Sequence, residues 1–186
     1  MKKSAVRERI LEVASRLFYE QGYNLTGINQ IIEEADIARA SLYNHFESKT
    51  HLLLVYLKEA EDIWFTEMEN FTASFTDPKQ KLLALFDFRM ERQSKRSFGG
   101  CQFIKISAEV SRQDSQVFDA VSHQKNRLKV FIVNIIKDLP ENNQTLTHNL
   151  LGDALFLLLE GAAVSGSIYK NQESMKTAKE IADKLI

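Results

Sequence analysis

The sequence is poor in the residues that interrupt helices, with two prolines and seven glycines among its 186 residues. This scarcity favours long helices joined by few turns. Its single cysteine, Cys101, excludes an intramolecular disulfide and suits a reducing cytoplasm. Apolar runs approaching eighteen residues are broken by a charge or by several polar groups, and residues 1–14 lack the apolar core of a signal peptide. We therefore expect a cytoplasmic protein without a membrane span.

The sequence also lacks a charge excess and the usual catalytic patterns. Its net charge of −1 gives no support to nucleic-acid binding, so any positive surface must arise from arrangement. The four histidines have no metal-ligand spacing, and Gly99-Gly100 lacks the strand and lysine of a phosphate-binding loop. We expect no metal, no cofactor and no catalytic residues, so the protein is not predicted to be an enzyme.

What the sequence does contain is helical periodicity, with 44% apolar residues to build a core. Ser4, Thr26, Ser48 and Asp77 are expected to cap helices, and Gly22 is expected to end the first helix in a left-handed conformation. The expected helices cover residues 4–21, 26–35, 38–45, 49–74, 78–95, 101–111, 115–139, 145–169 and 174–185. The predicted fold class is all-α.

Residues 25–49 are typical of a helix-turn-helix, in which the second short helix can enter a DNA major groove. Asp36 lies at the break and tolerates left-handed geometry, and Ile37 fills the angle between the helices. Leu42 and Phe46 are expected to point inward. The outer face of the second helix then presents Arg39, Ser41, Tyr43 and Asn44.

These outward residues suit DNA recognition. Arg39 can form two hydrogen bonds with a guanine edge or bind a phosphate, whereas Ser41 and Asn44 can reach base edges. Tyr43, His45 and Lys49 can donate to phosphate oxygens, and so fix register without reading sequence.

The segment SLYNHFESK resembles the signature of the TetR family of bacterial repressors. Residues matching the family pattern are Leu17, Phe18, Gly22, Tyr23, Thr26, Ile28, Ile31, Ala35, Leu42, Tyr43, His45, Phe46, Ser48 and Lys49. Asp36 replaces the usual Gly, and Ala38 replaces the usual capping Ser or Thr. The predicted DNA-binding residues are Lys3, Thr26, Gly27, Arg39, Ala40, Ser41, Tyr43, Asn44, His45 and Lys49.

The resemblance implies a three-helix DNA-binding domain at residues 1–48 and a helical ligand-binding and dimerisation domain at residues 49–186. The second part is rich in aromatic residues, which fit either an ordinary core or an apolar ligand pocket. The predicted pocket residues are Trp64, Met68, Phe86, Arg89, Met90, Phe103, Phe118, His123 and Phe156. The expected effector is a small, largely apolar molecule.

Cys101 follows two glycines at the start of an expected helix, with Lys105 one turn later. A helix N-terminus and a nearby cation favour a thiolate, so Cys101 is a candidate redox sensor. Some TetR relatives resemble this arrangement. The alternative is a small buried residue.

Residues 150–169 are apolar nearly all round, with a shallow surface at Gly161, Ala162, Ser165 and Gly166. This pattern predicts a helical dimer interface, unless the segment is the core helix of a monomer. A homodimer would read a palindromic operator in double-stranded DNA. The predicted function is therefore a ligand-responsive repressor, with a cysteine-based repressor or a ligand-independent DNA-binding interaction protein as alternatives.

Overall fold

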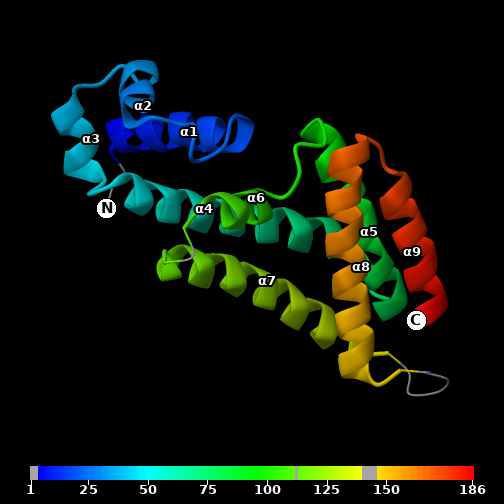
Figure 1. Ribbon diagram of the computed structural model, residues 1–186. Helices are drawn as coiled ribbons and strands as arrows, with labels where there is room; N and C mark the ends of the chain where they lie inside the picture. Colours follow the sequence, from blue (N-terminus) through cyan, green and yellow to red (C-terminus); the bar gives the residue numbers. More distant parts are fainter. Residues whose placement is uncertain (1–3, 112, 140–145) are drawn as a thin grey trace. The chain divides into compact units, whose positions relative to one another are not determined.

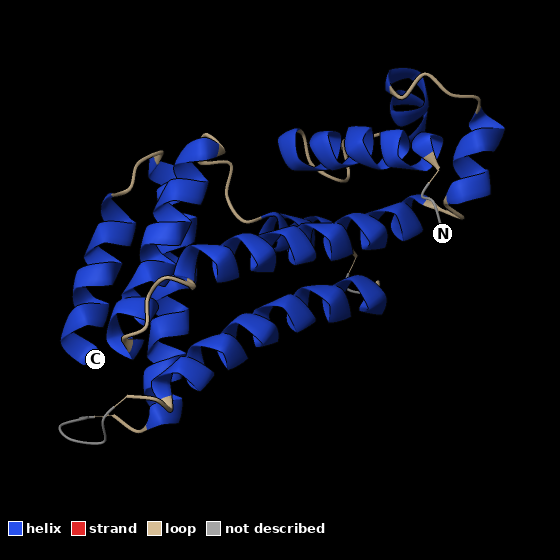
Figure 2. Ribbon diagram, turned by 180° about the vertical axis from the view of Figure 1, so that it is seen from behind, coloured by secondary structure: helices blue, strands red, loops and turns tan. Residues whose placement is uncertain are grey.

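The computed structural model describes residues 4–111, 113–139 and 146–186. Within these ranges all regular structure is helical, which confirms the predicted all-α class (Figures 1 and 2). The helices are α1 (Ala5–Glu20), α2 (Ile28–Glu34), α3 (Arg39–His45), α4 (Lys49–Thr72), α5 (Pro78–Lys95), α6 (Gln102–Glu109), α7 (Ser115–Ile136), α8 (His148–Tyr169) and α9 (Glu173–Leu185).

The chain divides into two compact units. Unit 1 comprises residues 1–62 and 102–122, and unit 2 comprises residues 63–101 and 123–186. The division falls inside α4 and inside α7, because each of these long helices packs along its length against different neighbours. The functional boundary predicted between residues 48 and 49 stays a prediction, and it lies within unit 1.

In unit 1, α1, α2 and α3 pack on one another through side chains that recur at helical spacing. Ile10, Ala14, Ile31 and Leu42 are completely buried. Phe18 adds aromatic contacts from α1, with its ring centroid 5.3 Å from that of Tyr23 and 5.7 Å from that of Tyr56. These contacts hold three short helices that would be marginal alone.

Most of the helix ends follow the sequence signals. Ser48 Oγ accepts a hydrogen bond from His51 N at 3.0 Å, and Asp77 caps α5 with Pro78 in its first turn. Gly22 has φ +95°, as expected for a residue that follows the end of α1. These three predictions are confirmed.

In unit 2, α5, α8 and α9 lie side by side (Figure 1). Their core contains Phe86, Leu155, Leu159 and Met175, each at most 2% exposed. By length and composition alone, α8 would also qualify as a membrane span. This is weak evidence, because the core helix of a helical bundle meets the same criterion.

Candidate nucleic-acid interface and body cavity

The outer face of α3 is open to solvent. Arg39, Ala40, Tyr43 and Asn44 are exposed, whereas Ser41 and His45 are partly buried. The opposite face is anchored, since Leu42 and the following Phe46 are both 0% exposed. The predicted inward face of α3 is therefore confirmed, and the predicted outward face is exposed except at Ser41, which is partly buried. A short helix fixed on one side and polar on the other is the geometry that a DNA-reading helix requires.

The turn between α2 and α3 has the predicted left-handed residue. Asp36 has φ +48°, and Ile37 N donates to Ile32 O at 3.2 Å across it, which closes the end of α2. Arg9 of α1 donates to Asp36 O at 3.0 Å. Ala38 provides no side-chain cap for α3, as its identity predicted. The turn is consequently held by α1 and by the backbone instead of by a capping hydroxyl.

Thr26 differs from the prediction. The N-cap of α2 is Gly27, and Thr26 is 0% exposed with its hydroxyl donating to Gly22 O at 2.7 Å. The predicted cap at Thr26 is wrong, because burial of the side chain directs its hydroxyl to the preceding turn. Gly27 is exposed, and a Cβ built on it would meet nothing within 4 Å.

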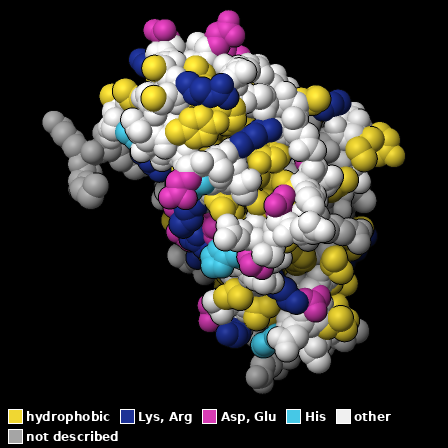
Figure 3. All heavy atoms as spheres, turned by 60° about the vertical axis from the view of Figure 1, so that its left-hand side comes forward, with side chains coloured by type: hydrophobic (Ala, Val, Ile, Leu, Met, Phe, Trp, Pro, Cys, Tyr) yellow, Lys and Arg dark blue, Asp and Glu magenta, His cyan; other side chains and the backbone are white. Residues whose placement is uncertain are grey.

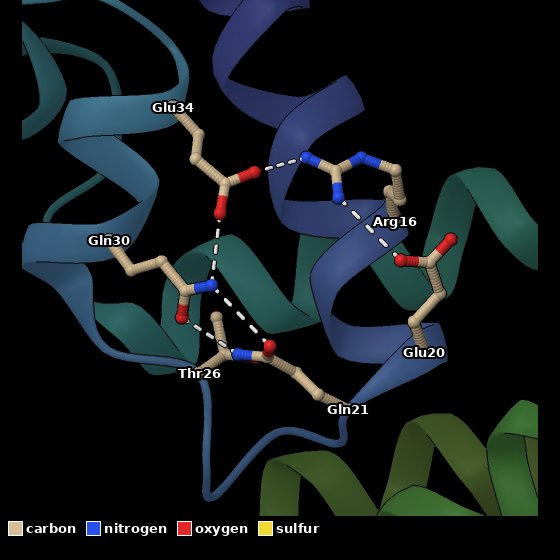
Figure 4. A network of polar contacts seen from close by, with 6 residues as sticks. All are labelled: Arg16, Glu20, Gln21, Thr26, Gln30 and Glu34. Atoms are coloured by element: carbon tan, nitrogen blue, oxygen red, sulfur yellow. Dashed lines mark hydrogen bonds and ion pairs between the residues drawn. The ribbon is translucent and has the colours of Figure 1, made fainter.

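A polar network joins the end of α1 to α2 (Figure 4). Gln21 Nε2 donates to Gln30 Oε1 at 2.7 Å, and Gln30 Nε2 donates to Glu34 Oε1 at 2.9 Å. Arg16 pairs with Glu34 and lies 3.6 Å from Glu20. The hydrogen bond from Arg16 lowers the pKa of Glu34 below its ordinary value and raises that of Arg16. The network fixes α2 against α1 on the solvent side.

Lys49 is folded back onto unit 1. Its Nζ donates to Tyr23 O at 2.6 Å and lies 4.2 Å from the centroid of the Tyr23 ring. Burial lowers the pKa of Lys49, although the nearby Glu109 carboxylate acts in the opposite direction. Lys49 therefore braces the turn after α1 in this structure, and its predicted phosphate contact stays a prediction.

Helix α6 is attached to the end of α1 and to the turn that follows it by two polar side chains. Lys105 Nζ donates to Tyr19 O. Glu109 accepts from Asn24 N at 2.9 Å through Oε2, and Asn24 Nδ2 donates to Glu109 O at 2.7 Å. Sequence reasoning placed Lys105 beside Cys101, but Lys105 bonds to α1 instead. No motif near Glu109 signalled its contact.

The charge pattern agrees with the balanced composition. On the face drawn in Figure 3, Lys and Arg side chains lie among Asp and Glu side chains and do not form one basic patch. Arg7 and Arg39 each lie over an aromatic ring, of Phe46 and Tyr43 respectively. The predicted contact at Lys3 lies outside the described residues.

Unit 2 contains a small apolar cavity that is too narrow to hold a water molecule. Its lining residues are Trp64, Met68, Leu85, Phe88, Arg89, Leu128 and Leu159. Three of these were predicted, namely Trp64, Met68 and Arg89. The leucines and Phe88 were missed because nothing in the sequence separates a cavity wall from an ordinary core.

The other predicted pocket residues do not line this cavity. Phe86 is buried in the core, whereas Met90 and Phe156 are partly buried against it. His123 is exposed on α7. Phe103 and Phe118 belong to unit 1. The aromatic count alone therefore predicted a wider pocket than the seven residues that surround this cavity.

A group of charged side chains borders the cavity. Lys125 of α7 pairs with Glu160 Oε2 of α8, and Arg89 NH2 of α5 lies 3.9 Å from Glu160 Oε1. Lys125 Nζ also lies 3.4 Å from the sulfur of Cys101, which is half-buried. Glu160 is the only charged residue in the apolar segment 154–169. Its isolation in the sequence could have indicated that it pairs with a charged residue of another helix.

A second feature of unit 2 is an apolar groove between α8 and α9. Its lining includes Gly161, Ala162 and Ser165 from the predicted interface, together with Leu157 and Ile181. Gly161 faces open space. Gly166 does not line the groove: it is buried, and a Cβ built on it would lie 3.3 Å from Gln93 Oε1. Its assignment to the interface stays a prediction.

Comparison with known protein families matches residues 10–56 to the model for bacterial regulatory proteins of the tetR family. The chain is 27% identical over 133 residues to the transcriptional repressor KstR2 of Mycolicibacterium smegmatis, covering 71% of this chain and 63% of that protein. It is 38% identical over 79 residues to the regulator LmrA of Bacillus subtilis, covering 42% of each. The chain thus spans less than two thirds of either relative.

Solved structures give the same fold over nearly the whole chain. A TetR-family transcriptional regulator from Streptomyces coelicolor superposes with a TM-score of 0.89 at 24% identity, covering 98% of this chain and 88% of that one. The likeness therefore extends through the helices of unit 2.

Proposed function

Since this chain belongs to the TetR family, we propose that it is a cytoplasmic, DNA-binding transcriptional repressor that acts as a homodimer and responds to a small molecule. The observation that carries the proposal is the outer face of α3. Arg39, Tyr43 and Asn44 are exposed there, while Leu42 and Phe46 anchor the opposite face. Such a helix can place three polar side chains in a major groove at no cost to its packing.

The dimer is supported by the outer surface of α8 and α9. Leu157 and Ile168 are 66% and 67% exposed, and Ile181 is 42% exposed across the groove. An apolar surface of this kind is unfavourable in water and is typical of a protein interface. A second copy of the same two helices would cover it around a two-fold axis, which is also the symmetry of a palindromic operator.

The response to a small molecule is supported by the cavity in unit 2. A ligand there would contact α4, α5, α7 and α8 at once, and two of these helices, α4 and α7, continue into unit 1. A ligand that prefers one arrangement of these helices shifts the population toward it. A ligand-independent DNA-binding protein would use the same α3 surface but would be indifferent to occupation of the cavity.

A cysteine-based response is the second candidate. It is supported by the amine of Lys125, 3.4 Å from Cys101 Sγ. Modification of the sulfur would disturb the Lys125–Glu160 ion pair next to the cavity. Cys101→Ser decides between the two candidates, because a quinone should release DNA from the wild type and leave the variant bound only if the cysteine carries the signal.

The experiment that tests the proposed function is selection from a pool of random DNA duplexes. The wild-type protein should enrich one sequence with two-fold symmetry. Arg39→Ala should enrich a different sequence if Arg39 reads a base, whereas Tyr43→Phe should enrich the same sequence with weaker binding overall. Failure of the wild type to enrich any sequence would contradict the proposal.

A further inference from the structure

Among the described residues, three largely buried charged side chains form a cluster in unit 2, one each on α5, α7 and α8. The exposed fractions are 9% for the side chain of Arg89, 14% for Glu160 and 17% for Lys125. Two positive groups face one negative group, so this part of the interior carries an excess positive charge. Burial of charge is unfavourable unless it is paired and hydrogen-bonded. The charge of the cluster therefore favours the binding of one more anion.

The pairing within the cluster is also incomplete. Glu160 Oε2 bonds to Lys125, but Glu160 Oε1 has no hydrogen bond from the residues that the structure describes, and its contact with Arg89 NH2, at 3.9 Å, is longer than a hydrogen bond. Arg89 Nε is buried and likewise has no hydrogen-bond partner among the described residues. Glu160 thus pairs mainly with Lys125, and the guanidinium of Arg89 still lacks a hydrogen-bond acceptor at Nε among the described residues.

Arg89 is also the one charged residue among the seven that line the apolar cavity. Its guanidinium carbon lies 5.9 Å from the centroid of the Trp64 ring, on the cavity wall. A neutral apolar ligand would fill the cavity and leave Arg89 unsatisfied. A carboxylate could accept hydrogen bonds from Nε and from a terminal nitrogen of the guanidinium together, which is the pairing that arginine geometry favours.

We propose that the effector is an apolar monocarboxylate, with its chain against Trp64 and Phe88 and its carboxylate on Arg89. This inference rests on the proposed ligand response and names the chemical class of the ligand. The cavity is too narrow to hold a water molecule, whereas ligand pockets typically measure roughly 300–1,000 Å³, so binding must separate the lining helices. This separation would displace the helices that line the cavity, which is the movement that the proposed ligand response requires.

The test uses Trp64 as reporter, because it is the only tryptophan in the sequence and lines the cavity. The full-length protein is titrated with octanoate and with octan-1-ol, which differ in charge at similar length, while the fluorescence of Trp64 is recorded. Octanoate should bind roughly ten to a hundred times more tightly than octan-1-ol. Equal binding of the two, or no response to octanoate, would overturn the proposal.

Variants separate the anion site from a general apolar site. Arg89→Met should abolish the preference for octanoate over octan-1-ol, and Arg89→Lys should keep part of it, since a lysine retains charge but not the paired donors. Arg127→Met is the matched control, because Arg127 also lies over an aromatic ring, Phe65, and does not line the cavity. A preference that survives in Arg89→Met, or is lost equally in the control, would refute the assignment.

Glu160→Gln is expected to change the affinity for octanoate in the opposite direction to Arg89→Met. A purely structural effect would not give this opposite change. Removal of the competing carboxylate should strengthen octanoate binding, because Lys125 then also lacks an anion. Binding of the selected DNA duplex is measured for each variant without octanoate. DNA binding that fails while the Trp64 response remains would contradict the proposed function and leave only the carboxylate site at Arg89 supported. DNA binding that persists without a Trp64 response would support the proposed function and overturn this inference.

Discussion

The two units use their inner polar side chains differently. In unit 1, Thr26 and Glu109 bond to groups of the turn that follows α1, and Lys105 bonds to Tyr19 in the last turn of α1. In unit 2, Arg89 and Glu160 each bury an atom that has no hydrogen-bond partner among the described residues. Unsatisfied buried groups are costly, and they persist in structures mainly at sites with another purpose. The bonds in unit 1 hold the end of α1 and the turn after it, whereas the cluster in unit 2 keeps two buried atoms that the proposed ligand would complete.

The largest expected effect lies in the core of unit 1. Phe46→Ala should reduce the free energy of unfolding by ~3–5 kcal/mol, because Phe46 is 0% exposed and its removal leaves a cavity under α3. Tyr43→Ala is the control from the exposed face, with an expected change of about 0.5 kcal/mol or less. Urea titration followed by circular dichroism measures both. Similar losses in the two variants would contradict the assigned faces of α3.

The next effect concerns the outer surfaces of the units, which are polar on α3 and apolar on α8. Leu157→Glu should weaken the proposed dimer by ~2 kcal/mol or more, since it buries a charge at the centre of the groove. Val130→Glu is the matched control, because Val130 is 57% exposed but lies on α7, outside the groove. Sedimentation analysis should show dissociation of the first variant alone. Dimers in both would place the interface elsewhere.

The contrast between satisfied and unsatisfied polar groups predicts opposite outcomes for two apolar substitutions. Thr26→Val removes the hydrogen bond to Gly22 O and should reduce the free energy of unfolding by ~1–3 kcal/mol. Arg89→Met removes an incompletely paired buried charge and should be neutral or stabilising. Thermal unfolding of the two variants measures the difference. If Arg89→Met reduced the free energy of unfolding more than Thr26→Val, the cluster would serve to stabilise the fold instead of to bind a ligand.

The smallest effect is the pH dependence of the network on the solvent side of unit 1. Because Arg16 lowers the pKa of Glu34 in the folded state, the ionised carboxylate stabilises that state. This contribution is fully present above the ordinary pKa of 4.5 and is lost as the pH falls through the lowered value. Glu34→Gln should therefore be less stable than the wild type at neutral pH, by a small amount that salt reduces.

The measurement is thermal unfolding of both proteins at neutral pH and below pH 4, at low salt. The two melting temperatures should converge at the acidic pH. A difference that is independent of pH would show that the Gln30 hydrogen bond, and not the ion pair with Arg16, carries the contribution of Glu34.

The comparison also explains what the sequence could predict. The helix-turn-helix follows from local rules, since Leu42 and Phe46 had to face inward and Asp36 had to turn the chain. Thr26 shows where local rules fail. Its type suits a cap, but tertiary burial directed its hydroxyl to Gly22 instead.

In unit 2 the same rules located helices but not contacts between them. The ion pair of Lys125 with Glu160 joins residues 35 positions apart on different helices. The same holds in unit 1, where the bond of Lys105 to Tyr19 spans 86 positions. No periodicity encodes such pairs. The sequence predicted an exposed apolar surface on α8 because this helix is apolar on more faces than one core can cover. It could not predict that Gly166 is buried, because this depends on the nearby side chain of Gln93.

The most direct test of the central claim, that the outer face of α3 reads DNA, is the dissociation constant for the selected duplex at fixed salt. The wild type is compared with a variant that combines Arg39→Ala, Tyr43→Phe and Asn44→Ala, each measured on the selected duplex and on a scrambled duplex. The wild type should prefer the selected duplex by roughly a thousandfold or more, and the variant should lose most of that preference while keeping its weak binding to the scrambled duplex. An unchanged preference in the variant would contradict the claim.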